Sequence, residues 1–247
     1  MEPESCIRLR YAKEWPLNWI SHLDTMRTLE RALRRAGLPV ALTQGFHPRP
    51  RISYGPALPV GFTSEAEYAD VELTEKLEPE LVLKRLNDVL PAGMRVLRAG
   101  VLRGPRRRSL ASILEVAGYR VKLSPADAPA SGSEPGPEPD LEKLGVRLRE
   151  LMDSKYVPYR RTGPKGEKTV DLRESIIDLR LVDSEIEMLL LLGGQGAPAD
   201  DGNGSPGARP TEILEVLNLD VSGARFHRTG LFERRWGQLW SPLDSGS

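Results

Sequence analysis

The chain has 247 residues, enough for one large domain or for two small domains that each bury a core. Its 35 Lys and Arg residues balance 35 Asp and Glu residues, so net charge predicts no class of partner and only local clusters of charge are informative. One cysteine and three histidines exclude an internal disulfide and a cysteine-held cluster, and argue against a multi-histidine metal site. We therefore expect no metal and no other cofactor.

The sequence also argues against a membrane location. No apolar run reaches the ~18 residues of a membrane span. The residues before Cys6 include two glutamates instead of the basic and apolar regions of a signal peptide. We expect a cytoplasmic protein that makes no membrane contact.

The first half of the chain alternates strand and helix patterns. Apolar residues alternate from Ile7, and Pro16 with Asn18 marks a turn. Ser21 precedes Asp24 by three residues, which is a capping box in its Asp form and predicts a helix from Ser21 to Ala36 that ends at Gly37. The further predicted elements are strands at 38–42 and 66–73, a helix at 79–90 and a strand at 94–102. Residues 6–103 thus follow the strand–helix–strand–strand–helix–strand order of a split βαβ unit.

The second half repeats this order. The predicted elements are a strand at 118–123, a helix at 141–152, a hairpin of 156–161 with 168–181, a strand at 187–192, a helix at 210–217 and a strand at 225–232. Residues 127–140 and 193–209 are rich in Gly, Pro, Ser and acidic residues, so we expect flexible insertions there. We predict an α+β protein with two tandem ferredoxin-like (split βαβ) domains, residues 1–105 and 106–247.

A proline-rich loop at residues 44–56 joins two apolar runs. Its prolines remove backbone donors and prevent regular helix or central strand, so the loop displays its side chains. The displayed candidates for RNA binding are Phe46, His47, Arg49, Arg51 and Tyr54. Guanidinium groups suit phosphates and planar rings suit unstacked bases. The alternative is a stiff crossover whose arginines are simply solvated.

The predicted helix at 21–36 carries a basic face. Arg27, Arg31, Arg34 and Arg35 lie opposite its apolar stripe, and Glu30 is placed to pair with Arg27 and Arg34. A basic helix face is commonly only solvated. Because the loop with Arg49 and Arg51 follows in the chain, we expect one continuous basic patch.

The second domain offers a similar mixture on its predicted hairpin. Aromatic and basic residues alternate there, and the RNA-binding candidates are Tyr159, Arg160, Arg161, Lys165 and Lys168. The alternative is that the hairpin is merely charged and that tyrosine serves as a strand former.

Signals for an enzyme are weak. His22 and His47 could act as acid and base in metal-independent RNA cleavage. However, His22 begins a helix, where the dipole disfavours an imidazolium, and its ring can simply complete the cap. The glycines of 193–207 match no phosphate-binding loop. We predict no catalytic residue, with His22 as the one weak candidate.

Four separated motifs carry a resemblance to a known family. They are Trp19-Ile20-Ser21-His22-Leu23-Asp24, Glu30-Arg31-Ala32-Leu33-Arg34-Arg35-Ala36-Gly37, the segment 44–53 followed by Gly55-Pro56-Ala57-Leu58-Pro59, and Glu65-Ala66-Glu67-Tyr68. Thinner matches follow at 170–173 and 209–212. In these motifs the chain resembles the radical SAM-linked protein family of unknown function, over most of residues 7–100.

The resemblance implies a partner and a setting. Members of that family are fused to, or encoded beside, radical SAM proteins with a cobalamin-binding-type domain, often near a ribonuclease of the RNase E/G type. This implies a radical SAM partner and an RNA context, but supplies no catalytic residues. This chain lacks the three-cysteine motif that holds an iron–sulfur cluster, so we do not expect it to be the radical enzyme.

We therefore predict an accessory RNA-binding protein that presents RNA to a radical SAM partner enzyme or acts with it. Two alternatives stay open. One is a protein-docking module of a radical SAM enzyme that makes no RNA contact. The other is a metal-independent endoribonuclease that uses His22, similar in outline to the tandem ferredoxin-like CRISPR RNA-processing enzymes.

Overall fold

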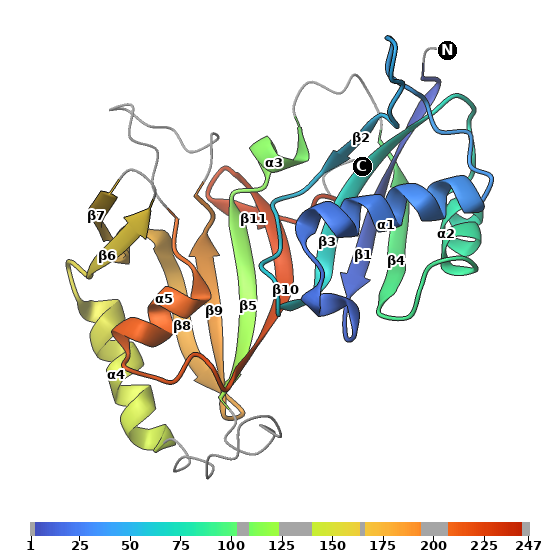
Figure 1. The fold of residues 1–247 in the computed structure, drawn as a ribbon. Helices are drawn as coiled ribbons and strands as arrows, with labels where there is room; N and C mark the ends of the chain where they lie inside the picture. The colour runs from blue at the N-terminus through green and yellow to red at the C-terminus, as the bar shows by residue number, and fades with distance from the viewer. Residues whose placement is uncertain (1–2, 103–108, 124–139, 164–165, 194–206, 244–247) are drawn as a thin grey trace. The chain divides into compact units, whose positions relative to one another are not determined.

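The chain folds into a mixed α/β structure in which most strands pair antiparallel and helices are few (Figure 1). The structure is a computed structural model and describes residues 3–102, 109–123, 140–163, 166–193 and 207–243. Two compact units divide the chain: Met1–Leu114 with Gly230–Ser247, and Glu115–Thr229. The C-terminal residues from Gly230 therefore group with the first unit, although residues 106–247 were predicted as one domain.

Up to Leu114, the described residues of the first unit form four strands, three α-helices and a 3₁₀ turn. These are β1 (Ser5–Lys13), a 3₁₀ turn (Leu17–Trp19), α1 (His22–Arg35), β2 (Ile52–Tyr54), β3 (Thr63–Leu73), α2 (Pro79–Asn87), β4 (Met94–Val101) and α3 (Leu110–Ile113). β1 pairs antiparallel with both β3 and β4, and β2 pairs antiparallel with residues 69–71 of β3. The predicted strand at 38–42 forms only isolated bridges at Val40 and Leu42.

Helix α1 begins and ends as its sequence predicts. The Ser21 hydroxyl accepts a hydrogen bond from the Asp24 backbone N–H and donates one to the Asp24 carboxylate. At the other end Gly37 has φ of +61°, and the N–H of Leu38 donates to the carbonyl of Leu33. This is a Schellman closure, which glycine favours because the left-handed conformation costs it little.

Helices α1 and α2 of the first unit cover one face of its strands. Leu29 and Leu33 of α1 and Leu86 of α2 pack in one core with Ile7 and Leu9 of β1. Because side chains alternate along a strand, Arg8 points to the opposite face. The apolar spacing of the two helices thus fixes which face of β1 is the core.

The opposite face of β1 holds a buried ion pair. The Arg8 guanidinium bonds the Asp70 carboxylate through two nitrogens, at 2.7 and 2.9 Å, and donates to the Pro242 carbonyl at 2.9 Å. Arg8 and Asp70 are both buried. This part of the sheet face is therefore covered by the C-terminal segment and is not an open RNA-binding platform.

The second unit contains the remaining elements. They are β5 (Val116–Leu123), α4 (Leu141–Asp153), β6 (Pro158–Gly163), β7 (Gly166–Asp171), a 3₁₀ turn (Arg173–Ser175), β8 (Ile176–Val182), β9 (Glu185–Leu191), α5 (Pro210–Val216) and β10 (Ala224–Arg235). The last residues of β10 belong to the first unit, where β11 (Gln238–Trp240) pairs with them. β9 pairs antiparallel with β5 and β8, and β10 is the other neighbour of β5. Buried Arg228 of β10 donates to the Tyr119 hydroxyl of β5 at 3.1 Å.

The predicted long hairpin of residues 156–161 and 168–181 is wrong in its second arm. β6 pairs with β7 only as far as Asp171, in a separate two-stranded sheet. Leu172 is buried and its N–H donates to the Val157 carbonyl, which extends the ladder by one residue, and the 3₁₀ turn at Arg173–Ser175 then leads into β8. The chain therefore forms two hairpins there, β6–β7 and β8–β9, separated by this turn.

Two predictions fall mainly outside the described residues. The insertion predicted at 127–140 is described only at Asp140, which caps α4 through the Lys143 N–H at 3.1 Å. The insertion predicted at 193–209 is described at Gly193 and at 207–209, where the Ala208 N–H donates to the Leu191 carbonyl at 3.1 Å. Of the helices described, none is long and apolar enough to cross a membrane.

Candidate nucleic-acid interface

The proline-rich loop is an excursion from the edge of the first unit's sheet. The Ala41 N–H donates to the Glu72 carbonyl of β3, and the Glu72 N–H donates to the Arg51 carbonyl. Residues 39–41 and 52–54 thus both pair with β3 along the same edge. Residues 42–50 project from this edge as a two-stranded finger. Backbone hydrogen bonds of 2.8 Å close the finger, from Thr43 N–H to the Arg49 carbonyl and from Arg51 N–H to the Ala41 carbonyl.

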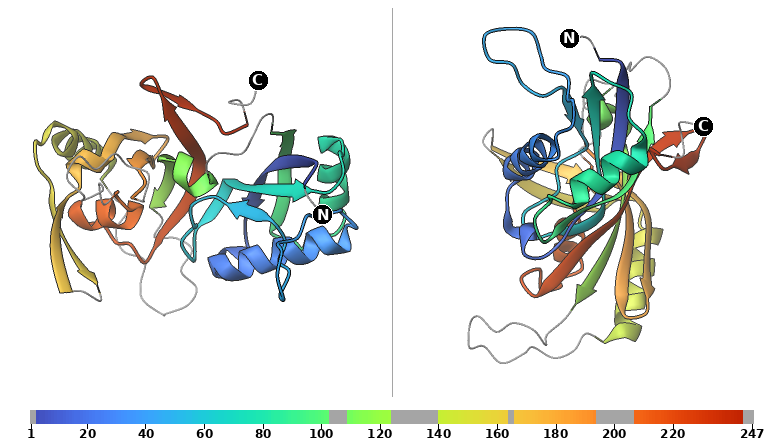
Figure 2. Two further views of the ribbon diagram at one scale, coloured as in Figure 1. Left: turned by 90° about the horizontal axis from the view of Figure 1, so that it is seen from above. Right: turned by 90° about the vertical axis from the view of Figure 1, so that its right-hand side faces the viewer.

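The finger displays an aromatic ring and a guanidinium group. Phe46 at its tip is fully exposed, and His47 and Arg49 are exposed as well. The Arg49 backbone N–H donates to the Thr43 hydroxyl at 3.0 Å, so the backbone under the arginine is fixed. In both views of Figure 2 the finger and α1 project on the same side of the first unit's strands. The sequence therefore presents Phe46 and Arg49 on a hydrogen-bonded stem next to a basic helix.

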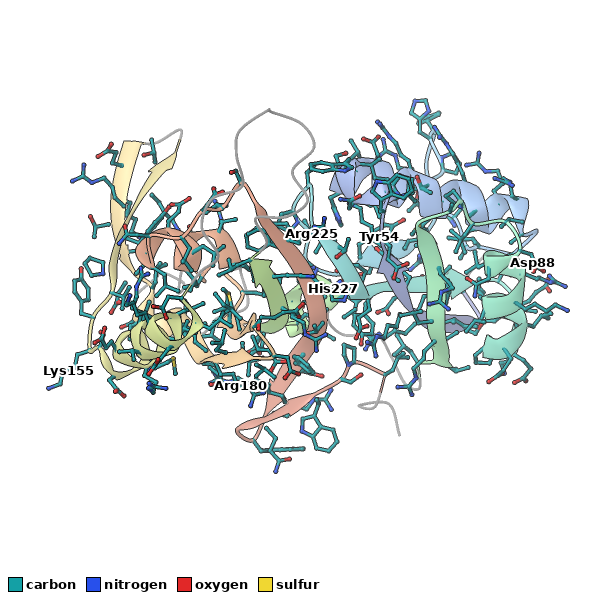
Figure 3. All side chains as sticks on the ribbon, turned by 90° about the horizontal axis from the view of Figure 1, so that it is seen from below. Tyr54, Asp88, Lys155, Arg180, Arg225 and His227 are labelled. Carbon is teal, nitrogen blue, oxygen red and sulfur yellow. The ribbon has the colours of Figure 1, made fainter. Side chains whose placement is uncertain are left out.

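Arg51 and Tyr54 contact other parts of the first unit. The Arg51 guanidinium pairs with the Glu72 carboxylate at 2.6 Å. The Tyr54 hydroxyl donates to the Met26 carbonyl at 3.4 Å, and its ring meets His22 edge to face with centroids 6.2 Å apart (Tyr54 is labelled in Figure 3). Burial raises the pKa of Tyr54, and the negative charge of Glu30 adds to this shift. These contacts hold β2 against β3 and α1, and leave Phe46 and His47 as the exposed rings of the loop.

The α1 arginines differ from the predicted pairing. Arg27 pairs with Asp24 at 3.2 Å, and not with Glu30 as predicted, although both acids lie three residues from it on the helix. Among the described residues, no carboxylate forms an ion pair with Arg31, Arg34 or Arg35, and the same holds for Arg49. The dipole of α1 favours Arg34 and Arg35 in its last turn, but it does not account for Arg31 or Arg49. Four exposed guanidinium groups, three on α1 and one on the finger, thus have no carboxylate partner among the described residues.

The two histidines considered for catalysis lie in different places. His22 begins α1 against Tyr54, which faces Ala69 in the register of β2 and β3. His47 lies at the tip of the finger, which leaves the sheet edge beside Glu72. The structure therefore does not place the imidazoles together as an acid and a base.

The candidates on the second unit's hairpin are largely paired with acids. The Arg161 guanidinium binds the Glu212 carboxylate through two nitrogens at 2.7 and 2.6 Å, and Glu212 is only 4% exposed. Tyr159 donates to the Glu215 carboxylate, and Arg160 pairs with Glu167 at 3.4 Å. Lys168 is exposed, and Lys165 lies outside the described residues. Tyr159 and Arg161 thus fasten the hairpin to α5.

The prediction of candidate residues omitted the most exposed tryptophans. Trp15 and Trp19 lie between β1 and α1, and Trp236 lies in the turn between β10 and β11. A sequence signal existed for the first two, because they fall in a turn that contains Pro16 and Asn18, where no core stripe passes. Of the residues that the structure describes, no group of three or more His, Cys, Asp and Glu side chains could hold a metal ion.

The comparisons with known proteins identify a family. Residues 6–199 match the family described as an uncharacterized protein conserved in bacteria (DUF2344). The match covers more than half of the chain, so the protein belongs to this family. No curated protein matches the chain.

Proposed function

We propose that this protein is a cytoplasmic accessory protein that binds RNA through α1 and the finger, and that it presents this RNA to a radical SAM partner enzyme. The RNA part is supported mainly by one observation: Arg31, Arg34, Arg35 and Arg49 have no carboxylate partner among the described residues and accompany the exposed ring of Phe46. When unpaired guanidinium groups bind RNA phosphates, the counterions condensed on those phosphates are released, and this release drives binding. The proposal of a radical SAM partner is supported by the resemblance of the four sequence motifs to the radical SAM-linked family.

We further propose that each unit is a ferredoxin-like domain. In the first unit the order β1-α1-β2-β3-α2-β4, with β1 between β3 and β4, supports this. In the second unit the corresponding order is β5-α4-β8-β9-α5-β10, with β5 between β9 and β10. On this proposal the β6–β7 hairpin is an insertion between α4 and β8.

The proposal is tested by fluorescence anisotropy of labelled single-stranded RNA across a salt series. Arg35→Ala/Arg49→Ala removes two of the unpaired charges, and Arg160→Ala/Arg180→Ala is the matched control on the second unit, since both of these arginines pair with carboxylates. Each phosphate contact contributes roughly 0.7 to the log–log salt slope, so the first variant is expected to lower the slope by about 1.4. The control variant is expected to leave the slope unchanged.

Other outcomes separate the alternatives. If the wild-type protein fails to bind RNA at low salt, the RNA proposal is wrong. Co-purification with a radical SAM protein after nuclease treatment would then favour a docking module. Cleavage of the RNA in EDTA that is lost in His22→Ala would favour the endoribonuclease.

A further inference from the structure

A group of exposed apolar side chains lies at the N-terminal end of α1, outside the surface described above. Trp15 is 76% exposed and Trp19 is 68% exposed, and Leu23 and Val60 are each more than half exposed. A soluble domain leaves single apolar residues in water routinely, but a cluster with two indole rings is typical of a binding site. We call these four residues the tryptophan cluster.

Backbone contacts bring the cluster together. The Gly61 N–H donates to the Asn18 carbonyl at 2.8 Å, which joins the loop that carries Val60 to the turn that carries Trp19. The Trp19 ring lies over Gly61, since a Cβ at Gly61 would meet its Cζ3 at 3.5 Å. Leu23 follows two residues after the Ser21 cap of α1. Trp19, Leu23 and Val60 therefore come from adjoining parts of one surface, and Trp15 lies four residues before Trp19 in the same turn.

The turn that carries the two tryptophans is fixed by the fold. The Glu14 N–H donates to the Gly93 carbonyl at 2.8 Å, and the Asn18 N–H donates to the Glu14 carbonyl at 3.0 Å. The ammonium group of buried Lys13 donates to the Ile20 carbonyl at 2.8 Å. Rings held on such a turn lose little conformational freedom when a ligand binds, which favours affinity.

The charge of α1 selects the ligand for this cluster. The helix sequence contains four arginines against two acidic residues, and its 14 residues extend about 21 Å from its first turn, which carries Leu23. The surface thus has indole rings at one end and guanidinium groups along its length. This combination is complementary to a polyanion that carries planar groups, because phosphates bind arginine and free bases stack on aromatic rings.

We propose that Trp15 and Trp19 stack unpaired bases of a single-stranded RNA whose phosphates follow the arginines of α1 towards the finger. This inference rests on the proposed RNA-binding function and specifies its ligand as single-stranded RNA with free bases. An RNA duplex offers no unstacked bases to the indoles and is bound more weakly.

The test compares three ligands of equal length: single-stranded RNA, the same RNA as a duplex, and an abasic oligonucleotide that has phosphates but no bases. Trp15→Ala/Trp19→Ala is expected to weaken single-stranded RNA binding by about 5- to 150-fold for each base lost from the indoles. The same variant is expected to bind the abasic ligand as the wild type does, with an unchanged salt slope. Trp236→Ala is the matched control, since Trp236 is 90% exposed in the same unit and is expected to change nothing.

A second variant keeps the test decisive. Trp15→Phe/Trp19→Phe retains aromatic rings, so binding is expected to persist while the quenching of tryptophan fluorescence by RNA is lost. The inference is overturned if the alanine variant binds single-stranded RNA as tightly as the wild type, or if it loses the abasic ligand to the same degree. In contrast, if the wild-type protein binds none of the three ligands at low salt, the proposed function itself fails.

Discussion

The finger of the first unit and the β6–β7 hairpin of the second unit have similar compositions but different roles for their side chains. Both mix aromatic and basic residues on a two-stranded projection. In the hairpin, Arg161 and Tyr159 contact the glutamates of α5 and secure the projection to the unit. In the finger, Phe46 and Arg49 are exposed, and the stem is held by backbone hydrogen bonds together with the Thr43 hydroxyl.

The difference lies in acids that are distant in the sequence. Glu212 is 51 residues from Arg161, and it also accepts the Arg209 N–H at the start of α5. No comparable carboxylate reaches Arg49 from the residues that the structure describes. A basic and aromatic segment therefore becomes a candidate RNA surface only where the rest of the fold leaves its charges unpaired.

The largest expected effect is on the stability of the second unit. Glu212→Ala leaves the Arg161 guanidinium without its carboxylate and removes the cap of α5, so we expect a loss of about 3–5 kcal/mol in the free energy of unfolding. Urea denaturation followed by circular dichroism measures this. Glu215→Ala, which removes only the exposed partner of Tyr159, is the control and is expected to cost about 1 kcal/mol. Equal effects of the two variants would mean that the Arg161 pair does not secure the hairpin.

A second effect tests whether acids control the availability of arginines. Glu72→Gln removes the carboxylate that pairs with Arg51 at the base of the finger, so Arg51 becomes available to phosphate. We expect the log–log salt slope for single-stranded RNA to steepen by roughly 0.7, the value of one contact. Glu167→Gln releases Arg160 on the hairpin in the same way and is expected to leave RNA binding unchanged. If wild type, Glu72→Gln and Glu167→Gln all give the same salt slope, then pairing with acids does not control which arginines bind RNA.

Local signals predicted helices well. The Ser21 cap and Gly37 placed both ends of α1 within one residue, because each signal acts on hydrogen bonds of its own turn. The break between β7 and β8 was missed, because it lies in a short 3₁₀ turn, Arg173–Ser175, that no proline or glycine marks. The grouping of the C-terminus with the first unit was also missed, since Arg8 and Pro242 are 234 residues apart and neither carries a local pattern.

The candidate site was likewise predicted only where its features depend on local sequence. The exposed finger with Phe46 and Arg49 follows from prolines and composition, which are local. The pairing of Arg51 with Glu72 and of Arg161 with Glu212 follows from tertiary structure, and no pattern in either segment indicates it. A list of basic residues therefore predicted where charge lies, but not which charges the fold neutralises.

The smallest expected effect concerns the Tyr159 contact that holds the hairpin. The hydrogen bond to the Glu215 carboxylate raises the pKa of the Tyr159 hydroxyl to about 12, and burial acts in the same direction. Because the pKa is raised in the folded state from an ordinary value of about 10, the contribution to stability is fully present below pH 10 and is lost as the pH rises through 12. Tyr159→Phe lacks this contribution at every pH.

Thermal unfolding of both proteins between about pH 8 and pH 12 measures the effect as a difference in melting temperature. Taking the difference cancels the titration of lysines and of the other tyrosines, which both proteins share. We expect wild type to be the more stable protein at pH 8, with the difference shrinking as the pH approaches 12. A difference that stays constant over this range would show that the hydroxyl does not hold the hairpin through Glu215, and the contrast with the finger would then rest on Arg161 alone.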